Sequence, residues 1–130
     1  DYGVSMQASQ PGGKPVVLVV EDEPLLLLNA VDMVEEAGFA AVSASNADVA
    51  VRILESRTDI CLVFTDIDMP GSMDGMKLAA AIRDRWPPIA IILTSGHIAA
   101  HDLTLPARSV FFAKPYREKE IVAEIRRMAA

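Results

Sequence analysis

Short apolar runs alternate along the chain with longer amphipathic segments, beginning just after Lys14. Each run has the length of a strand, and continuous apolar runs of this kind indicate strands that are buried on both faces. The run at residues 40–44 is the weakest of them. The pattern predicts strands at residues 16–20, 40–44, 60–65, 89–94 and 110–113.

The first two intervening segments carry signals for the ends of helices. Pro24 suits the first turn of a helix, and Gly38 supplies a stop for it. Ser45 with Asp48 resembles a capping box at the start of the next helix. These signals predict helices over residues 25–37 and about 46–56.

Two further helices are indicated by apolar residues at helical spacing. The third helix ends at Trp86, which precedes two prolines. The segment at 96–108 contains Pro106 and no long helical pattern, so we expect any helix there to be short or irregular. The apolar faces consist of Gly75, Leu78, Ala79 and Ile82 in the third helix and of Ile121, Val122, Ile125 and Met128 in the last.

The alternation of strands and helices indicates an α/β fold. Repeated strand–helix units give a parallel sheet with helices on both faces, and right-handed crossovers restrict how the strands can be ordered. We therefore predict a doubly wound, five-stranded parallel sheet of flavodoxin-like order 2-1-3-4-5, with an atypical short fourth helix.

The composition supports one folded domain. Of the 130 residues, 52% are hydrophobic and 23% are charged, which suits a single globular domain with its own core. We expect a flexible N-terminal tail over residues 1–14, without signal-peptide features, and the folded domain over 15–130. Because no apolar run approaches the roughly 20 residues of a membrane helix, we expect no membrane partner.

The net charge and the cysteine content indicate which classes of partner and which redox compartment to expect. The net charge is −6 and the basic residues are scattered, which argues against direct nucleic-acid binding. Cys61 has no second cysteine to pair with, so we interpret it as a core residue and expect a reducing, cytoplasmic setting.

Polar residues follow the predicted strands at their carboxyl ends, where doubly wound sheets place their sites. Carboxylates follow the first and third strands, a hydroxyl follows the fourth, and an ammonium group follows the fifth. Such an all-oxygen cluster suits Mg²⁺ (or Mn²⁺), which relieves the repulsion between carboxylates. An aspartate in this setting can act as a nucleophile toward phosphorus. The residues are Glu21, Asp22 and Glu23; Asp66 and Asp68; Thr94, Ser95 and Gly96; and Lys114 and Pro115.

These strand-end motifs resemble those of response-regulator receiver domains, the phosphorylation switches of bacterial two-component systems. The resemblance covers about residues 15 to 129, nearly the whole folded chain. Each motif alone is weak, whereas four in the right order, each at a strand end, are highly specific. The motifs are Glu21-Asp22, Asp66-Ile67-Asp68-Met69-Pro70, Ser95-Gly96, and Phe111 followed by Lys114-Pro115.

The resemblance implies which residues bind the metal and the phosphoryl group. Asp66 is the expected phosphoacceptor. Its phosphoryl group would come from a phosphohistidine on a sensor histidine kinase or a phosphotransfer protein. Asp22 and Asp66 would ligate Mg²⁺ directly, Glu21 would act through water, and Asp68 would contribute its backbone carbonyl. Such a domain is a signalling switch rather than an enzyme.

The resemblance also implies how phosphorylation would be sensed. Lys114 would neutralise phosphoryl charge, Ser95 would move toward the phosphoryl group, and Phe111 would swing inward with it. The altered surface would then bias a downstream protein or an output domain outside this sequence, and a phosphorylation-dependent dimer is compatible with this behaviour.

The sequence departs from the common receiver pattern in three places. Glu21 replaces an aspartate, Phe111 replaces a tyrosine, and the segment between the switch serine and the lysine looks shortened. Asp68 and His97 each lie two residues beyond a key position, so family analogy suggests that they tune the phosphoryl lifetime.

Two other functions compete with the receiver interpretation. The Asp66-Ile67-Asp68 string also fits a haloacid-dehalogenase-like phosphohydrolase, although that motif follows the first strand in those enzymes and a cap is expected. A degenerate receiver that acts only as a binding module is the second alternative, and the intact Asp66 and Lys114 argue against it.

Simpler explanations exist for several individual signals. Acids before a helix start complement its dipole, and aspartates often form turns, so no strand-end motif is decisive by itself. His97 and His101 have the spacing of a metal pair on a helix, but we favour surface histidines. Leucines fill positions 25–28, a whole helical turn, so at least one of them should be exposed.

Overall fold

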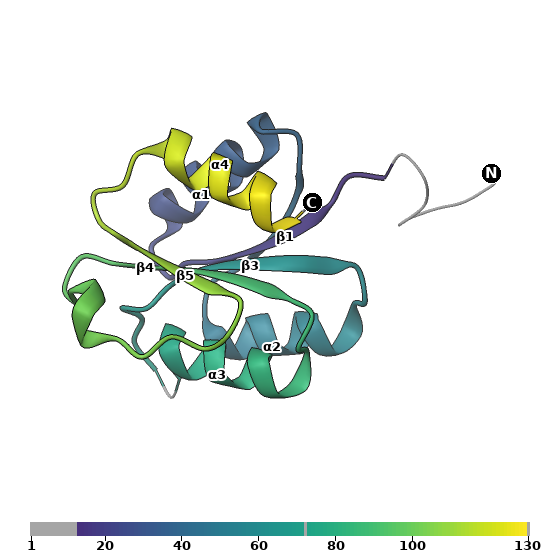
Figure 1. Ribbon diagram of the computed structural model, residues 1–130. Helices are drawn as coiled ribbons and strands as arrows, with labels where there is room; N and C mark the ends of the chain where they lie inside the picture. Colours follow the sequence, from purple (N-terminus) through teal and green to yellow (C-terminus); the bar gives the residue numbers. More distant parts are fainter. Residues whose placement is uncertain (1–12, 72, 130) are drawn as a thin grey trace.

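Five parallel strands form a sheet with helices on both faces (Figure 1). The computed structural model describes residues 13–71 and 73–129, so nearly all of the predicted N-terminal tail lies outside the described residues. The strand order β2-β1-β3-β4-β5 confirms the predicted doubly wound arrangement. The strands are β1 (Val16–Val20), β2 (Ala40–Ala44), β3 (Ile60–Asp66), β4 (Ala90–Ser95) and β5 (Ser109–Ala113).

Two helices cover each face of the sheet. In Figure 1, α1 and α4 lie above the sheet, whereas α2 and α3 lie below it. No helix among the described residues is long and apolar enough to cross a membrane. The helices are α1 (Pro24–Glu36), α2 (Ala47–Ser56), α3 (Gly75–Arg85) and α4 (Glu118–Ala129), together with a single 3₁₀ turn, η1 (Ala100–Asp102).

The central strands are apolar up to their carboxyl ends because both of their faces are covered. Successive side chains of a strand point to opposite faces, so β1 contributes to two separate cores. Val17 and Val19 pack with α1 and α4, whereas Leu18 and Val20 pack with α2 and α3. This two-sided burial explains why the sequence shows continuous apolar runs rather than an alternating pattern.

Single residues set the start of α2 and the end of α1, and the first of these differs from the prediction. The cap of α2 is Asn46, whose Oδ1 accepts a hydrogen bond from the Val49 backbone N–H at 2.8 Å. The predicted capping box starting at Ser45 was therefore wrong by one residue, because the asparagine carbonyl reaches the free amide of the first turn. Gly38 ends α1 with a φ of 99°, as expected for a stop residue.

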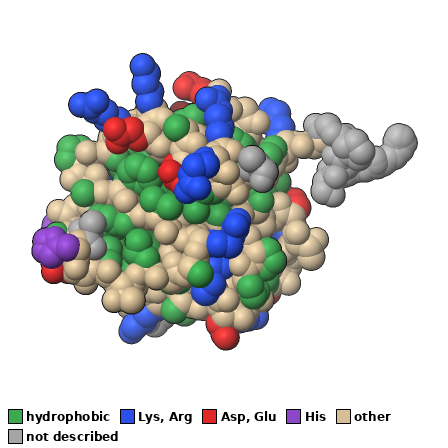
Figure 2. Space-filling view, in the orientation of Figure 1, with side chains coloured by type: hydrophobic (Ala, Val, Ile, Leu, Met, Phe, Trp, Pro, Cys, Tyr) green, Lys and Arg blue, Asp and Glu red, His purple; other side chains and the backbone are tan. Residues whose placement is uncertain are grey.

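The segment between β4 and β5 contains only the short turn η1, which confirms the predicted short and irregular helix. No residue of β5 is fully buried, and Leu105 beside it is 36% exposed. Hydrophobic side chains are accordingly visible at the surface over β5 in Figure 2. The shortened segment thus leaves one edge of the sheet more open than the rest.

Cys61 is half-buried rather than a full core residue. Its thiol donates a hydrogen bond to the Val16 carbonyl at 3.3 Å, and burial raises the pKa of the thiol. The predicted core position is therefore only partly right. A raised pKa keeps this cysteine in the unreactive thiol form at neutral pH.

Candidate functional site

The carboxyl ends of β1, β3, β4 and β5 meet at one edge of the sheet. The parallel register pairs Val20 with Thr65, Asp66 with Thr94, and Ser95 with Ala113. The residues immediately after these strand ends therefore come together, although they are far apart in the sequence. Of the side chains predicted for the site, this edge brings together those of Glu21, Asp22, Asp66, Asp68, Ser95 and Lys114.

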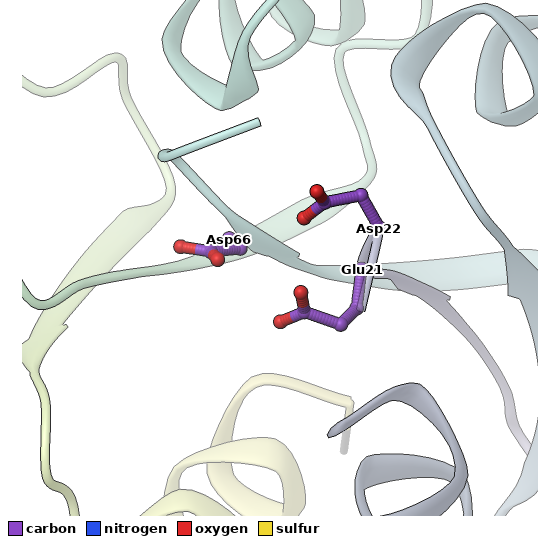
Figure 3. Close-up of side chains that lie close together, drawn as sticks. All are labelled: Glu21, Asp22 and Asp66. Carbon is purple, nitrogen blue, oxygen red and sulfur yellow. The ribbon is translucent and has the colours of Figure 1, made fainter. Parts of the chain in front are cut away.

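Three carboxylates surround one space at this edge (Figure 3). Ligand atoms of Glu21, Asp22 and Asp66 all lie within 4.8 Å of one another. Asp66 is 6% exposed and Glu21 is 8% exposed, whereas Asp22 is exposed to solvent. An all-oxygen donor set that is half buried and half open fits Mg²⁺, which keeps some of its waters and accepts phosphate oxygens.

Burial and neighbouring charge both act on Glu21. Burial raises the pKa of its carboxyl group, and the charge of Asp66 acts in the same direction. The backbone N–H of Glu23, which donates to Glu21 at 3.1 Å, and the charge of Lys114 oppose that rise without cancelling it. The folded protein thus stabilises the charged form of Glu21 less than water does.

Lys114 provides the positive charge of the site. Its Nζ donates to Asp66 Oδ2 at 3.0 Å and lies 3.8 Å from Glu21 Oε1. Burial lowers the pKa of the ammonium group, but the hydrogen bond to Asp66 and the two negative charges outweigh burial and raise the pKa overall. Lys114 is therefore fully charged at neutral pH and neutralises part of the carboxylate cluster.

Asp68 contacts the site through its side chain as well as its backbone. Its backbone N–H donates to Asp66 Oδ1 at 3.2 Å. Its Oδ2 accepts hydrogen bonds from the Ser95 hydroxyl at 2.7 Å and from the Gly96 backbone N–H at 3.2 Å. The sequence predicted a role for the Asp68 carbonyl but did not anticipate this carboxylate contact.

The remaining predicted residues fall into two groups. Phe111 is half-buried and packs against the core between the sheet and helices α2 and α3. Its role in the switch stays a prediction. His97 and His101 are both exposed, and neither belongs to the acidic group that could hold a metal in the described part of the chain. This placement supports surface histidines over a metal pair.

A pocket of about 430 Å³ opens beside the acidic cluster between α1 and α4. Its walls include Leu26 and Met33 from α1 and Tyr116 after β5, and Glu21 and Asp66 lie at its polar end. Tyr116 was not among the residues predicted for the site, and its ring packs edge-on against Phe64 at 6.0 Å between centroids. Its position two residues after Lys114 was the signal that could have revealed it.

Comparison with known proteins places this geometry in a family. Residues 17–126 match the family model of the response regulator receiver domain. The chain is 29% identical over 126 residues to the sensor kinase CckA of Brucella abortus, covering 94% of this chain and 13% of that protein. It is 32% identical over 119 residues to the positive alginate biosynthesis regulatory protein of Pseudomonas aeruginosa, covering 85% of this chain and 46% of that protein.

Solved structures show the same fold. A response regulator receiver protein from Sinorhizobium medicae superposes with a TM-score of 0.82 at 26% identity, covering 92% of this chain and 97% of that one. The receiver domain of the hybrid histidine kinase CckA gives a TM-score of 0.75 at 23% identity, covering 88% of this chain and 98% of that one.

The chain belongs to the response regulator receiver family of two-component systems. Receiver domains are signalling switches that interact with histidine kinases or phosphotransfer proteins, and they bind Mg²⁺ at an acidic pocket. The chain spans less than half the length of the curated relatives described above, which are longer proteins.

Proposed function

We propose that this chain is a cytoplasmic phosphorylation switch in which Asp66 accepts a phosphoryl group from a phosphohistidine. The observation that supports this most directly is the position of Asp66 between the Glu21-Asp22 pair and the Lys114 ammonium group. Acids that can hold a divalent cation on one side and an ammonium group on the other suit transfer to a carboxylate, because both reactants carry negative charge.

Each residue of the site has a part in the transfer. A carboxylate oxygen of Asp66 forms the new bond to phosphorus while the bond between phosphorus and the histidine nitrogen breaks. Asp22, Asp66 and the Asp68 carbonyl would hold Mg²⁺, with Glu21 acting through water. When bound, Mg²⁺ offsets the charge on the phosphoryl oxygens. Lys114, already within hydrogen-bond distance of Asp66, stabilises the same oxygens from the other side.

In this proposal phosphorylation transmits the signal by changing the surface of the protein. A phosphoryl group adds roughly −1.5 to −2 charges at neutral pH. In our proposal Ser95 and Phe111 respond to that charge and alter the surface formed by η1, β5 and α4, which a downstream protein or an output domain then recognises. A phosphorylation-dependent dimer through this surface belongs to the same proposal, whereas direct binding of nucleic acid or membrane does not.

The phosphodonor partner would approach the open end of the acidic site. Three leucines in the first turns of α1 are exposed to solvent: Leu25 at 64%, Leu26 at 46% and Leu28 at 56%. Leu26 also lines the pocket that opens beside Asp66. Exposed apolar residues next to a phosphoacceptor support contact with a protein donor.

The experiment is intact-mass measurement after incubation with Mg²⁺ and acetyl phosphate. We expect one phosphoryl adduct on the parent protein and none on Asp66→Asn, because the amide is not a nucleophile for this reaction. Asp84→Asn is the matched control, since it makes the same change at an exposed aspartate of α3 and leaves the acceptor in place. Omission of Mg²⁺ should prevent formation of the adduct.

Two outcomes would contradict the proposal. Failure of the folded parent to form any adduct would favour a degenerate receiver that acts as a binding module. Sustained hydrolysis of phosphate esters would instead favour the haloacid-dehalogenase-like hydrolase that the Asp66-Ile67-Asp68 string also fits.

A further inference from the structure

The Ser95 hydroxyl is fully engaged in hydrogen bonds. It is 1% exposed, and it donates its one hydrogen to Asp68 Oδ2 at 2.7 Å. The same oxygen accepts from the backbone N–H of His97 at 3.0 Å and of Ile98 at 3.1 Å. Ser95 therefore fixes the start of the loop after β4 while Asp68 fixes Ser95.

The Asp68 carboxylate joins the loop after β3 to the end of β4, which is distant in the sequence. Its Oδ2 accepts from Ser95, the last residue of β4, and from the backbone N–H of Gly96, the first residue of the loop that follows. Asp68 itself lies in the loop after β3, and its backbone N–H donates to Oδ1 of Asp66, the last residue of that strand. A bond from a hydroxyl to a charged carboxylate is short and roughly twice as strong as a neutral one.

We propose that the Asp68 carboxylate is a latch that holds the Ser95 hydroxyl in its inactive position until a phosphoryl group on Asp66 competes for it. This inference rests on the proposed function and assigns Asp68 a positioning role beyond its backbone carbonyl. Because the hydroxyl has a single hydrogen, Ser95 must release Asp68 before it can donate to a phosphoryl oxygen.

The release has a consequence for the switch surface. Ser95 also accepts from His97 and Ile98, so its movement detaches those backbone groups from their present partner. Ile98 packs against the core, and the loop leads directly into η1. Breaking the latch thus transmits phosphorylation to the segment before β5, and the strength of the latch sets how readily the switch responds.

The test measures binding of beryllofluoride, a phosphoryl mimic, in the presence of Mg²⁺. Asp68→Ala removes the latch, so we expect affinity to rise about tenfold, the scale of one charge-assisted hydrogen bond. Asp68→Asn keeps an acceptor oxygen without the charge and should give a smaller gain. In a Ser95→Ala background, the effect of Asp68→Ala should largely disappear.

This comparison separates the latch from simple charge repulsion. If Asp68 acted only by repelling the phosphoryl group, Asp68→Asn and Asp68→Ala would give equal gains, and both gains would persist in the Ser95→Ala background. Equal and persistent gains would therefore overturn the latch, as would unchanged or weaker binding by Asp68→Ala.

Amide hydrogen exchange in the unphosphorylated, metal-free protein tests the latch independently of phosphorylation. In Asp68→Ala we expect faster exchange at His97 and Ile98, because a freed Ser95 hydroxyl no longer accepts steadily from them. Unchanged exchange at both amides would overturn the latch alone. Failure of the parent to bind beryllofluoride would instead overturn the proposed function. The regulatory effect of the latch on that function would then be overturned as well.

Discussion

Opposing effects of burial and charge act on individual residues of the acidic site. Burial raises the pKa of Glu21, whereas the charge of Lys114 lowers it. Burial lowers the pKa of Lys114, but the neighbouring carboxylates raise the pKa of Lys114 overall. Metal-free protein therefore holds a partly compensated negative cluster. Its stability should depend on pH and on the charge of single side chains.

The first prediction concerns Glu21→Gln in metal-free protein. The folded state raises the pKa of Glu21 above 4.5, so the folded state binds this proton more tightly than the unfolded state. The resulting stability is fully present below 4.5 and is lost as the pH rises through the raised pKa. At pH 7 the amide avoids that loss, so Glu21→Gln should melt at a higher temperature than the parent.

This prediction is checked by measuring the melting temperature at several pH values and by comparing Glu21→Gln with a variant of a neighbouring glutamate. The gain in melting temperature should shrink as the pH falls through the raised pKa and should be absent below 4.5, where Glu21 is protonated in both the folded and the unfolded state. Glu23→Gln, an exposed neighbour that carries the same formal charge, should give little change. Equal shifts for the two variants would show that net charge, rather than burial of Glu21, governs the effect.

Element boundaries follow mainly from local chemistry, and the sequence predicted most of them. Apolar runs identified all five strands to within one residue at each end, because buried parallel strands have no polar face. The cap of α2 differed because both Ser45 and Asn46 are good capping residues. Only the backbone path decides which of the two side chains meets the free amide of Val49.

The second prediction tests the observed cap. Asn46→Ala removes the acceptor for the Val49 amide and should lower the free energy of unfolding by about 1 kcal/mol. Ser45→Ala, at the exposed neighbouring position, should change it by less than about 0.5 kcal/mol. Urea denaturation of the two variants measures both values, and a larger loss for Ser45→Ala would restore the capping box.

The third prediction concerns the close approach of α3 to the acceptor loop. A Cβ at Gly75 would lie 2.3 Å from the Asp66 carbonyl oxygen and 2.6 Å from Ile67 Cα. Gly75→Ala must therefore displace the backbone beside the acceptor, and we expect it to cost roughly 1–3 kcal/mol of stability and to slow phosphorylation of Asp66. Thermal denaturation and the rate of adduct formation measure the two effects.

Gly96→Ala is the matched control for this prediction. A Cβ at Gly96 would meet Lys114 Cβ at 3.8 Å, an ordinary van der Waals contact. We expect Gly96→Ala to retain nearly the stability of the parent. A similar loss of stability in both variants would mean that the approach of α3 to Asp66 is not the cause.

At the scale of the whole molecule, ligands at the acidic site should stabilise the fold. The site is assembled from the ends of β1, β3 and β5, which come together only in the folded chain. A ligand that binds only this state raises the free energy of unfolding by about 2.7 kcal/mol at roughly a hundred times its Kd.

The fourth prediction applies this linkage to Mg²⁺ and beryllofluoride. Together they should raise the melting temperature of the parent, and removal of Mg²⁺ with a chelator should reverse the shift. Asp66→Asn should show no shift from beryllofluoride, because its neutral amide cannot replace the carboxylate that binds beryllium. A parent-like shift in Asp66→Asn would place the binding site elsewhere.

The sequence by itself determined the order of the elements and the identity of the acidic site. Both depend on short-range patterns: apolar runs define strands, and polar residues directly after them lie at one edge of a parallel sheet. The tertiary structure alone decided the contact of Asp68 with Ser95, which are 27 residues apart, and the pocket beside Tyr116. Such features depend on the distance between loops that only packing brings together, and no local pattern encodes that distance.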